Sequence, residues 1–294
     1  LFQRAFCEFK LERFETAAQT SQAFIKAYPQ HKLAPDALMI LAEALFRLDR
    51  FDESKQQYAG ILNQYPEYAQ TAQVLYGFGW SAFKLYQYDS AIDNFSRLIE
   101  RFPKSELAAD AAYRIGDCYF ATGRFSQAVD AYRRMLDRYP NAAFSARAAY
   151  QIAQSYYRME DYVRASSAYD RVITYYPQSD LVDDSINMKG ASLFNLERYT
   201  EAIDVFRRIT KPSDLADDAL FQIGNCYYNM GDYERANESY RRVITEFADS
   251  DRVSDAISGI MDSYLSRGQV DRAIELVDEY LRDNPRGRLA DTML

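Results

Sequence analysis

The segment AYRRMLDRYP, residues 131–140, has the apolar spacing of an amphipathic helix and stops at an aromatic residue followed by proline. The same wording occurs before it as NFSRLIERFP (94–103) and after it as AYDRVITYYP (168–177). Proline lacks the N–H that a continuing helix donates, and its ring clashes with the preceding turn. We therefore predict that a helix ends at each of these points and that the aromatic residue folds back on its last turn.

The prolines reveal an internal repeat that runs through the chain. Five of them follow one another at intervals of 37 residues: Pro29, Pro66, Pro103, Pro140 and Pro177. Pro212 comes 35 residues later, Ala248 occupies the next position, and Pro285 lies 37 residues beyond it. Of the eight prolines, only Pro35 is out of phase. A period in this range is typical of solenoids built from repeated supersecondary units.

Each repeat has the periodicity of two helices rather than of strands. In residues 108–140, one apolar stripe precedes Gly123 and a second follows it, so Gly123 is predicted to end the first helix. A small residue recurs in the first helix, where the two backbones are expected to approach closely: Ala5, Ala42, Gly79, Gly116, Ala153, Gly190 and Gly224. The second helix repeats an alanine followed four residues later by an aromatic, as in Ala128 and Tyr132.

This pattern resembles the tetratricopeptide repeat family, whose signature spaces Leu-Gly, Tyr, Ala, an aromatic and Pro at set intervals. The spacing is kept by Leu220, Ile223-Gly224, Tyr227, Gly231, Tyr233, Ala236 and Tyr240. The resemblance implies an all-α, superhelical solenoid of about eight antiparallel helix pairs, with the first helix of each pair on the concave side. It covers residues 1–294 as a single array, which we expect to be a piece of a longer chain.

The repeats depart from the family in length, at about 37 residues against 34, and the extra residues follow the proline. The recurring "YP-x-S" wording there resembles a subgroup found in bacterial cell-envelope proteins. That resemblance favours the periplasm or cell envelope over the cytoplasm.

Composition narrows the classes of partner. The formal net charge is -8, from 35 basic and 43 acidic residues, which argues against nucleic acid as a partner. No apolar run approaches the roughly 18 residues of a membrane helix, so no direct membrane insertion is expected. With one histidine, His31, expected to be a solvated loop residue, and no CxxC motif, the sequence predicts no metal site, cofactor or catalytic triad.

Cysteines and acids have structural explanations. Cys7, Cys118 and Cys226 lie two residues after the small position, where other repeats have alanine or serine, so we predict free thiols filling a small space. Acidic residues begin several first helices, as in Asp110, Asp184 and Asp218, where they complement the helix dipole. Neither pattern indicates catalysis, and we expect no enzyme activity.

Aromatic residues form a ladder along the first helices. The repeated positions are three residues before and four residues after the small position. One interpretation is ordinary packing; the other is an amphipathic floor for a peptide, with charged residues giving it direction. The predicted ligand-binding residues are Tyr76, Trp80, Phe83, Lys84, Tyr113, Asp117, Phe120, Arg147, Tyr150, Tyr157 and Arg158. The family's basic clamp for peptide carboxylates is not predicted, because aromatics stand in its positions.

One repeat is irregular. Between Pro177 and Pro212 we expect a linker two residues shorter, and Lys189 stands where other repeats have Leu or Ile. A lysine in a core position is expected to extend its charge to solvent or pair with an acid. This repeat is predicted either to bend the solenoid or contact a partner, or simply to tolerate the change.

The sequence thus predicts a non-catalytic scaffold that binds a protein or peptide in its concave groove. The alternative is a structural module that self-associates or positions a catalytic domain outside these residues.

Overall fold

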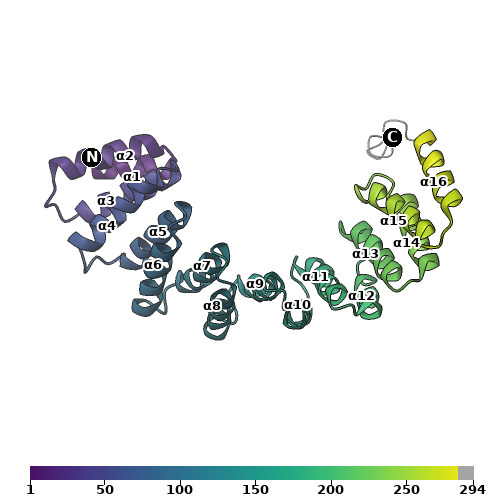
Figure 1. The fold of residues 1–294 in the computed structure, drawn as a ribbon. Coiled ribbons are helices and arrows are strands. Elements are labelled where there is room, and N and C mark those ends of the chain that lie inside the picture. Colours follow the sequence, from purple (N-terminus) through teal and green to yellow (C-terminus); the bar gives the residue numbers. More distant parts are fainter. Residues whose placement is uncertain (284–294) are drawn as a thin grey trace. The chain divides into compact units, whose positions relative to one another are not determined.

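The computed structural model describes residues 1–283, and these form sixteen α-helices with no strand. Figure 1 shows the helices following one another as pairs along the chain. Their bounds are α1 (Phe2–Lys10), α2 (Phe14–Ala27), α3 (Ala34–Arg47), α4 (Phe51–Gln64), α5 (Thr71–Lys84), α6 (Tyr88–Arg101), α7 (Ala108–Ala121), α8 (Phe125–Arg138), α9 (Ser145–Arg158), α10 (Tyr162–Tyr175), α11 (Val182–Asn195), α12 (Tyr199–Phe206), α13 (Ala216–Asn229), α14 (Tyr233–Glu246), α15 (Arg252–Ser266) and α16 (Val270–Asp283). The fold is the predicted all-α solenoid of eight helix pairs.

The chain divides into an N-terminal unit, Leu1–Gln151, and a C-terminal unit, Ile152–Leu294, with the boundary inside α9. Within each unit the same packing recurs. A first helix contacts the second helix of its own pair, and that second helix contacts the next first helix, as in α5, α6 and α7. First helices also contact one another, as α3 does α5 and α13 does α15. The first helices therefore share one face of each unit.

The turn inside each pair ends the first helix as predicted. Gly123 has φ +71, and the N–H groups of Gly123 and Arg124 donate to the carbonyls of Phe120 and Tyr119 at 3.0 and 2.9 Å. This is the Schellman arrangement, which needs a left-handed residue that glycine adopts without strain. Other turns adopt the same conformation with a non-glycine residue: Glu12, Asp49, Tyr86, Glu160 and Glu197.

The second helices end at the aromatic residue that precedes proline. Tyr139 leaves helical geometry at φ -132 and ψ 60, while its N–H still donates to Met135 at 2.8 Å. The predicted fold-back is seen at Tyr28, whose ring lies 5.4 Å from Phe24. Tyr139 instead extends to the preceding repeat, where its hydroxyl lies 3.3 Å from the carbonyl of Pro103. The aromatic residue can therefore join neighbouring repeats as well as close its own helix.

The irregular repeat between Pro177 and Pro212 is shorter than the others, but not in the segment that was predicted. The segment between Pro177 and the start of α11 at Val182 has the same length as that between Pro140 and Ser145. The two missing residues fall instead between Phe206 and Pro212, which are six positions apart where Tyr132 and Pro140 are eight apart, and α12 ends at Phe206 after 8 residues. The expectation of a shorter linker was wrong, because proline spacing alone does not say which side of the core position lost residues. Pro285 lies outside the described residues.

The small position lets the two helices of a pair cross closely. A Cβ built on Gly116 would lie 2.3 Å from the Tyr132 ring, and one on Gly224 would lie 2.4 Å from the Tyr240 ring. Both rings are almost fully buried. The second-helix alanine, such as Ala128, is also fully buried. The predicted crossing points at Gly79, Gly116, Gly190 and Gly224 are confirmed, and each places a glycine against a large aromatic ring.

The cysteine positions follow the same logic. Cys118 and Cys226 are buried free thiols, and burial raises the pKa of each to about 12. The equivalent serines Ser81, Ser192 and Ser263 donate to the carbonyl four residues earlier at 2.7–2.9 Å. Cys7 is also a free thiol but is exposed.

We expect a variant with Cys7, Cys118 and Cys226 all changed to serine to fold normally. Each buried serine can donate to the i-4 carbonyl as its equivalents do, so the loss should stay below about 1 kcal/mol per site. Thermal melts of the wild-type protein with and without reductant should superimpose. A large shift with reductant would reveal disulfides and contradict the small-space explanation.

Candidate binding surface

A groove opens on the first-helix face of the N-terminal unit. Its volume is about 600 Å³, within the range of ligand sites. Helices α3 and α5 supply most of its walls. The lining residues are Phe9, Glu43, Phe46, Arg47, Tyr58, Gln73, Tyr76, Gly77, Trp80, Lys84 and Leu107. Five of these eleven residues are aromatic, and three carry a charge.

Trp80 forms part of the wall, at a position where most other repeats have a polar residue. Its ring meets Tyr76 and Phe83 at centroid distances of 6.3 and 5.6 Å, both edge-to-face. The side chain is only partly buried, so one part of the indole remains available to a ligand. The predicted place of Trp80 beside Tyr76 and Phe83 is confirmed.

Arg114 of α7 supports this wall, and the sequence analysis missed it. Its guanidinium carbon lies 4.5 Å from the Trp80 ring centroid. The same group pairs with Asp110 at 3.3 Å and Asp117 at 2.8 Å. Tyr76 donates its hydroxyl to Asp110, and burial together with this bond raises the pKa of Tyr76 to about 12. In the sequence, Arg114 is marked only by its place directly after Tyr113, which belongs to the aromatic ladder.

The acidic residue Asp117, predicted to contact a ligand, is occupied within the protein. Besides Arg114, it accepts a hydrogen bond from Tyr132 at 2.7 Å, and burial raises its pKa. Asp110 likewise joins α7 to Tyr76 of the preceding repeat. Asp110 therefore binds across repeats in addition to lying in the first turn of α7, whereas the partners of Asp117 lie within its own repeat.

The predicted site residues separate into different environments. Tyr76, Trp80 and Lys84 line the groove, whereas Phe83 packs behind it on Trp80 and Tyr88. Tyr113 is 2% exposed, so the expected exposed aromatic edge does not hold there; its ring packs between Tyr132 and Phe144. Phe120 packs on Phe125 at 5.3 Å. The remaining predicted residues lie on α9 outside this groove: Arg147 and Tyr150 in the N-terminal unit, Tyr157 and Arg158 in the C-terminal unit.

Glu43 is a partly buried carboxylate in the groove wall. Burial raises its pKa, while the positive charges of Arg47 and Lys10 partly lower it. Among the described residues, none forms a hydrogen bond or an ion pair with this carboxylate within the usual distances. Its charge is therefore held in a poorly solvated place without a direct counter-group.

We expect Glu43→Gln to raise stability near neutral pH. A raised pKa means that the folded state holds the proton more tightly than the unfolded chain. The associated stability is present below the unfolded pKa, near the ordinary value of 4.5, and is lost as pH rises through the folded pKa. The advantage of the glutamine variant should therefore grow between about pH 4 and pH 7. Urea midpoints of both proteins across this range measure it, and an advantage that shrinks with pH would contradict the burial of this charge.

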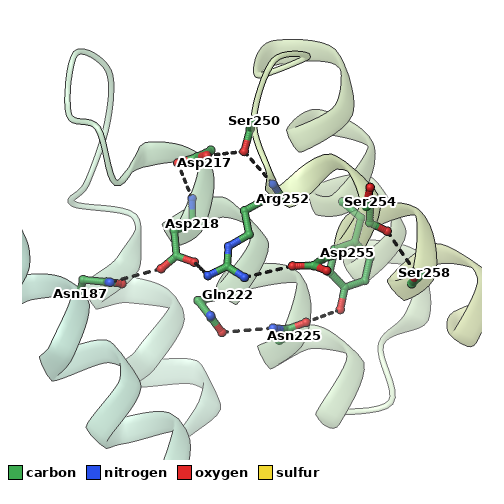
Figure 2. A network of polar contacts seen from close by, with 11 residues as sticks. Asn187, Asp217, Asp218, Gln222, Asn225, Ser250, Arg252, Ser254, Asp255 and Ser258 are labelled. Carbon is green, nitrogen blue, oxygen red and sulfur yellow. Dashed lines mark hydrogen bonds and ion pairs between the residues drawn. The ribbon is translucent and has the colours of Figure 1, made fainter. Parts of the chain in front are cut away.

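The same face of the C-terminal unit carries a polar network in place of an aromatic groove. Figure 2 shows Arg252 between Asp218 and Asp255, with ion-pair distances of 2.6 and 3.0 Å. Asn187 donates to Asp218 at 3.2 Å, and Ser250 donates to Asp217. These contacts join α11, α13 and α15, so the charges serve the packing of neighbouring first helices.

Lys189 also finds a partner, as predicted for a lysine in a core position. Its Nζ lies 2.5 Å from a carboxylate oxygen of Asp170 on α10. The lysine joins α11 to the preceding second helix, which explains its tolerance. His31, expected to be a solvated loop residue, is exposed, and its Nδ1 accepts a hydrogen bond from the Leu33 N–H at 3.1 Å.

Comparison with known proteins identifies the class. Tetratricopeptide repeat models match residues 8–69, 76–143 and 218–250, which together make up more than half of the chain. This chain belongs to the tetratricopeptide repeat family. An outer membrane lipoprotein model matches residues 111–211, and a PPR repeat model matches residues 255–284. The lipoprotein match is the finding that bears on the predicted envelope resemblance. A search of curated protein sequences finds no significant match.

Solved structures share the fold at low sequence identity. A tetratricopeptide repeat protein from Cytophaga hutchinsonii is 16% identical with a TM-score of 0.64, covering 88% of this chain and 99% of that one. One from Parabacteroides merdae is 13% identical with a TM-score of 0.54, covering 88% and 97%. The structure of Naa15/Naa10 bound to HypK is 14% identical with a TM-score of 0.61, covering 98% of this chain and 43% of that one. Repeat proteins of this kind are in general protein-interaction scaffolds without catalytic activity. No helix among the described residues is long and apolar enough to span a bilayer.

Proposed function

We propose that this protein binds an extended or helical segment of a partner protein in the groove between α3 and α5. The single observation that carries the proposal is the partly exposed Trp80, in a position that is polar in most other repeats, lining a groove of about 600 Å³ with Tyr76 and Phe46 in its walls. Aromatic side chains offer large contact areas at low entropic cost and dominate the energy of many interfaces.

The surrounding contacts support a preformed site. Trp80 is held by Phe83 on its own helix and by Arg114 on α7, and Arg114 is itself fixed by two carboxylates. A wall that is rigid before binding loses little conformational entropy when a ligand arrives. The proposed site therefore needs no rearrangement of the helices.

Selection of nonapeptides from a random phage-displayed library against the full chain tests the proposal. Synthetic copies of the enriched peptides, made without tryptophan, should shift the fluorescence of Trp80, the only tryptophan, in a saturable way. Two outcomes would refute the groove: no peptide is enriched, or the enriched peptides bind while Trp80 fluorescence stays flat.

A further inference from the structure

Glu43, Asp117 and Asn225 occupy the same position in their repeats, one residue after the small position. Asp117 accepts a hydrogen bond from Tyr132 at 2.7 Å, and Asn225 accepts one from Tyr240 at 2.7 Å. Tyr58 is the corresponding tyrosine for Glu43, but no such bond joins them in this part of the chain. Glutamate is one methylene longer than aspartate or asparagine, so its carboxylate cannot take the same place relative to the tyrosine hydroxyl.

The groove around Glu43 suits a cation. Phe46, Tyr76 and Trp80 line the same space, and aromatic faces attract lysine and arginine groups. Arg47 and Lys10 act on Glu43 only through longer-range attraction, so a ligand cation beside Glu43 would supply the directly bonded counter-charge that is missing there. Burial of the carboxylate raises its pKa, in agreement with the scarcity of solvent around it.

Two cationic side chains at the groove, Arg47 and Lys84, indicate which residues should lie beside the basic group of the ligand. Arg47 and Lys84 line the groove and are exposed, and Lys84 lies 5.9 Å from the ring centroid of Phe51. Arg114 contributes no free charge, because Asp110 and Asp117 neutralise it. Charge complementarity therefore favours a basic side chain at Glu43 with acidic residues beside it.

We infer that the groove selects a partner segment in which a lysine or arginine side chain enters beside Glu43, between Trp80 and Phe46, and acidic neighbours face Arg47 and Lys84. The inference rests on the proposed function, and it names the chemistry that the groove recognises. The attraction to Glu43 and the contact with the aromatic rings together hold the basic side chain, because water and salt would weaken either interaction alone.

The test uses the nonapeptides enriched on the full chain. They should share a lysine or arginine at one position, and replacing it by norleucine, which keeps the length without the charge, should weaken binding about tenfold or more. On Glu43→Gln, the difference in affinity between the basic and norleucine peptides should shrink by about threefold or more, because only the aromatic contacts to the cation remain. Glu106→Gln removes a similar charge from an exposed linker residue outside the groove and should preserve the full difference.

The outcomes separate the two proposals. Saturable Trp80 shifts from peptides with no shared basic residue, or an undiminished lysine preference on Glu43→Gln, would overturn the inference and leave the groove as a binding site. Enriched peptides that leave Trp80 unchanged would overturn both. Circular dichroism of Glu43→Gln confirms that the variant is folded before binding is compared.

Discussion

Gly116→Ala is expected to destabilise the N-terminal unit by about 1–3 kcal/mol, although alanine is the better helix former. The new Cβ would lie 2.3 Å from the Tyr132 ring, far inside van der Waals contact. The ring has little room to move, because it is fully buried and its hydroxyl donates to Asp117 at 2.7 Å. The helices of this pair would have to separate, which disturbs the contacts of α7 with α6 of the preceding repeat.

Gly60→Ala provides the matched control. Gly60 lies inside α4, and nothing stands within 4 Å of the Cβ that alanine would add. This variant should gain up to about 1 kcal/mol from helix propensity. Urea unfolding of the full chain, followed by circular dichroism, compares the two. Equal midpoints for Gly116→Ala and Gly60→Ala would show that the crossing is looser than the structure indicates.

Trp80→Ala is expected to weaken binding of the enriched nonapeptides by about tenfold to a hundredfold. The change removes the partly exposed indole from the wall of the groove. It leaves the ion pairs of Arg114 with Asp110 and Asp117 in place, so the helices should stay folded. Fluorescence anisotropy of fluorescein-labelled peptides measures affinity in a protein that no longer contains tryptophan.

Tyr86→Asn controls for the loss of an exposed aromatic residue. Tyr86 is 79% exposed in the turn after α5, does not line the groove, and has φ 59, which asparagine tolerates. It should bind the peptides as the wild type does. If Trp80→Ala also binds them unchanged, the groove between α3 and α5 is not where they bind.

The helix pairs and their crossing points could be predicted from the sequence. Proline and the αL turn residue act locally, so Pro140 and Gly123 marked helix ends without knowledge of the rest of the chain. The small position opposite a large aromatic recurs in most repeats, so Gly116 and Tyr132 could be paired by their periodicity. The position of Trp80 beside Tyr76 and Phe83 followed from helical spacing alone, since residues three and four apart share a face.

The candidate site itself depended on contacts that differ between repeats. Tyr76 and Tyr113 have equivalent positions, yet Phe144 covers Tyr113, whereas Tyr76 lines the groove. Glu43 and Asp117 are equivalent as well, yet only Asp117 reaches a tyrosine hydroxyl. The spacing of the prolines likewise could not predict that α12 is the shortened element. By itself, the sequence determined the repeated helices and the face they share, because backbone conformation and small crossing residues act over short distances. Only the tertiary structure decided which side chains on that face stay open, because this depends on how residues of neighbouring repeats cover one another.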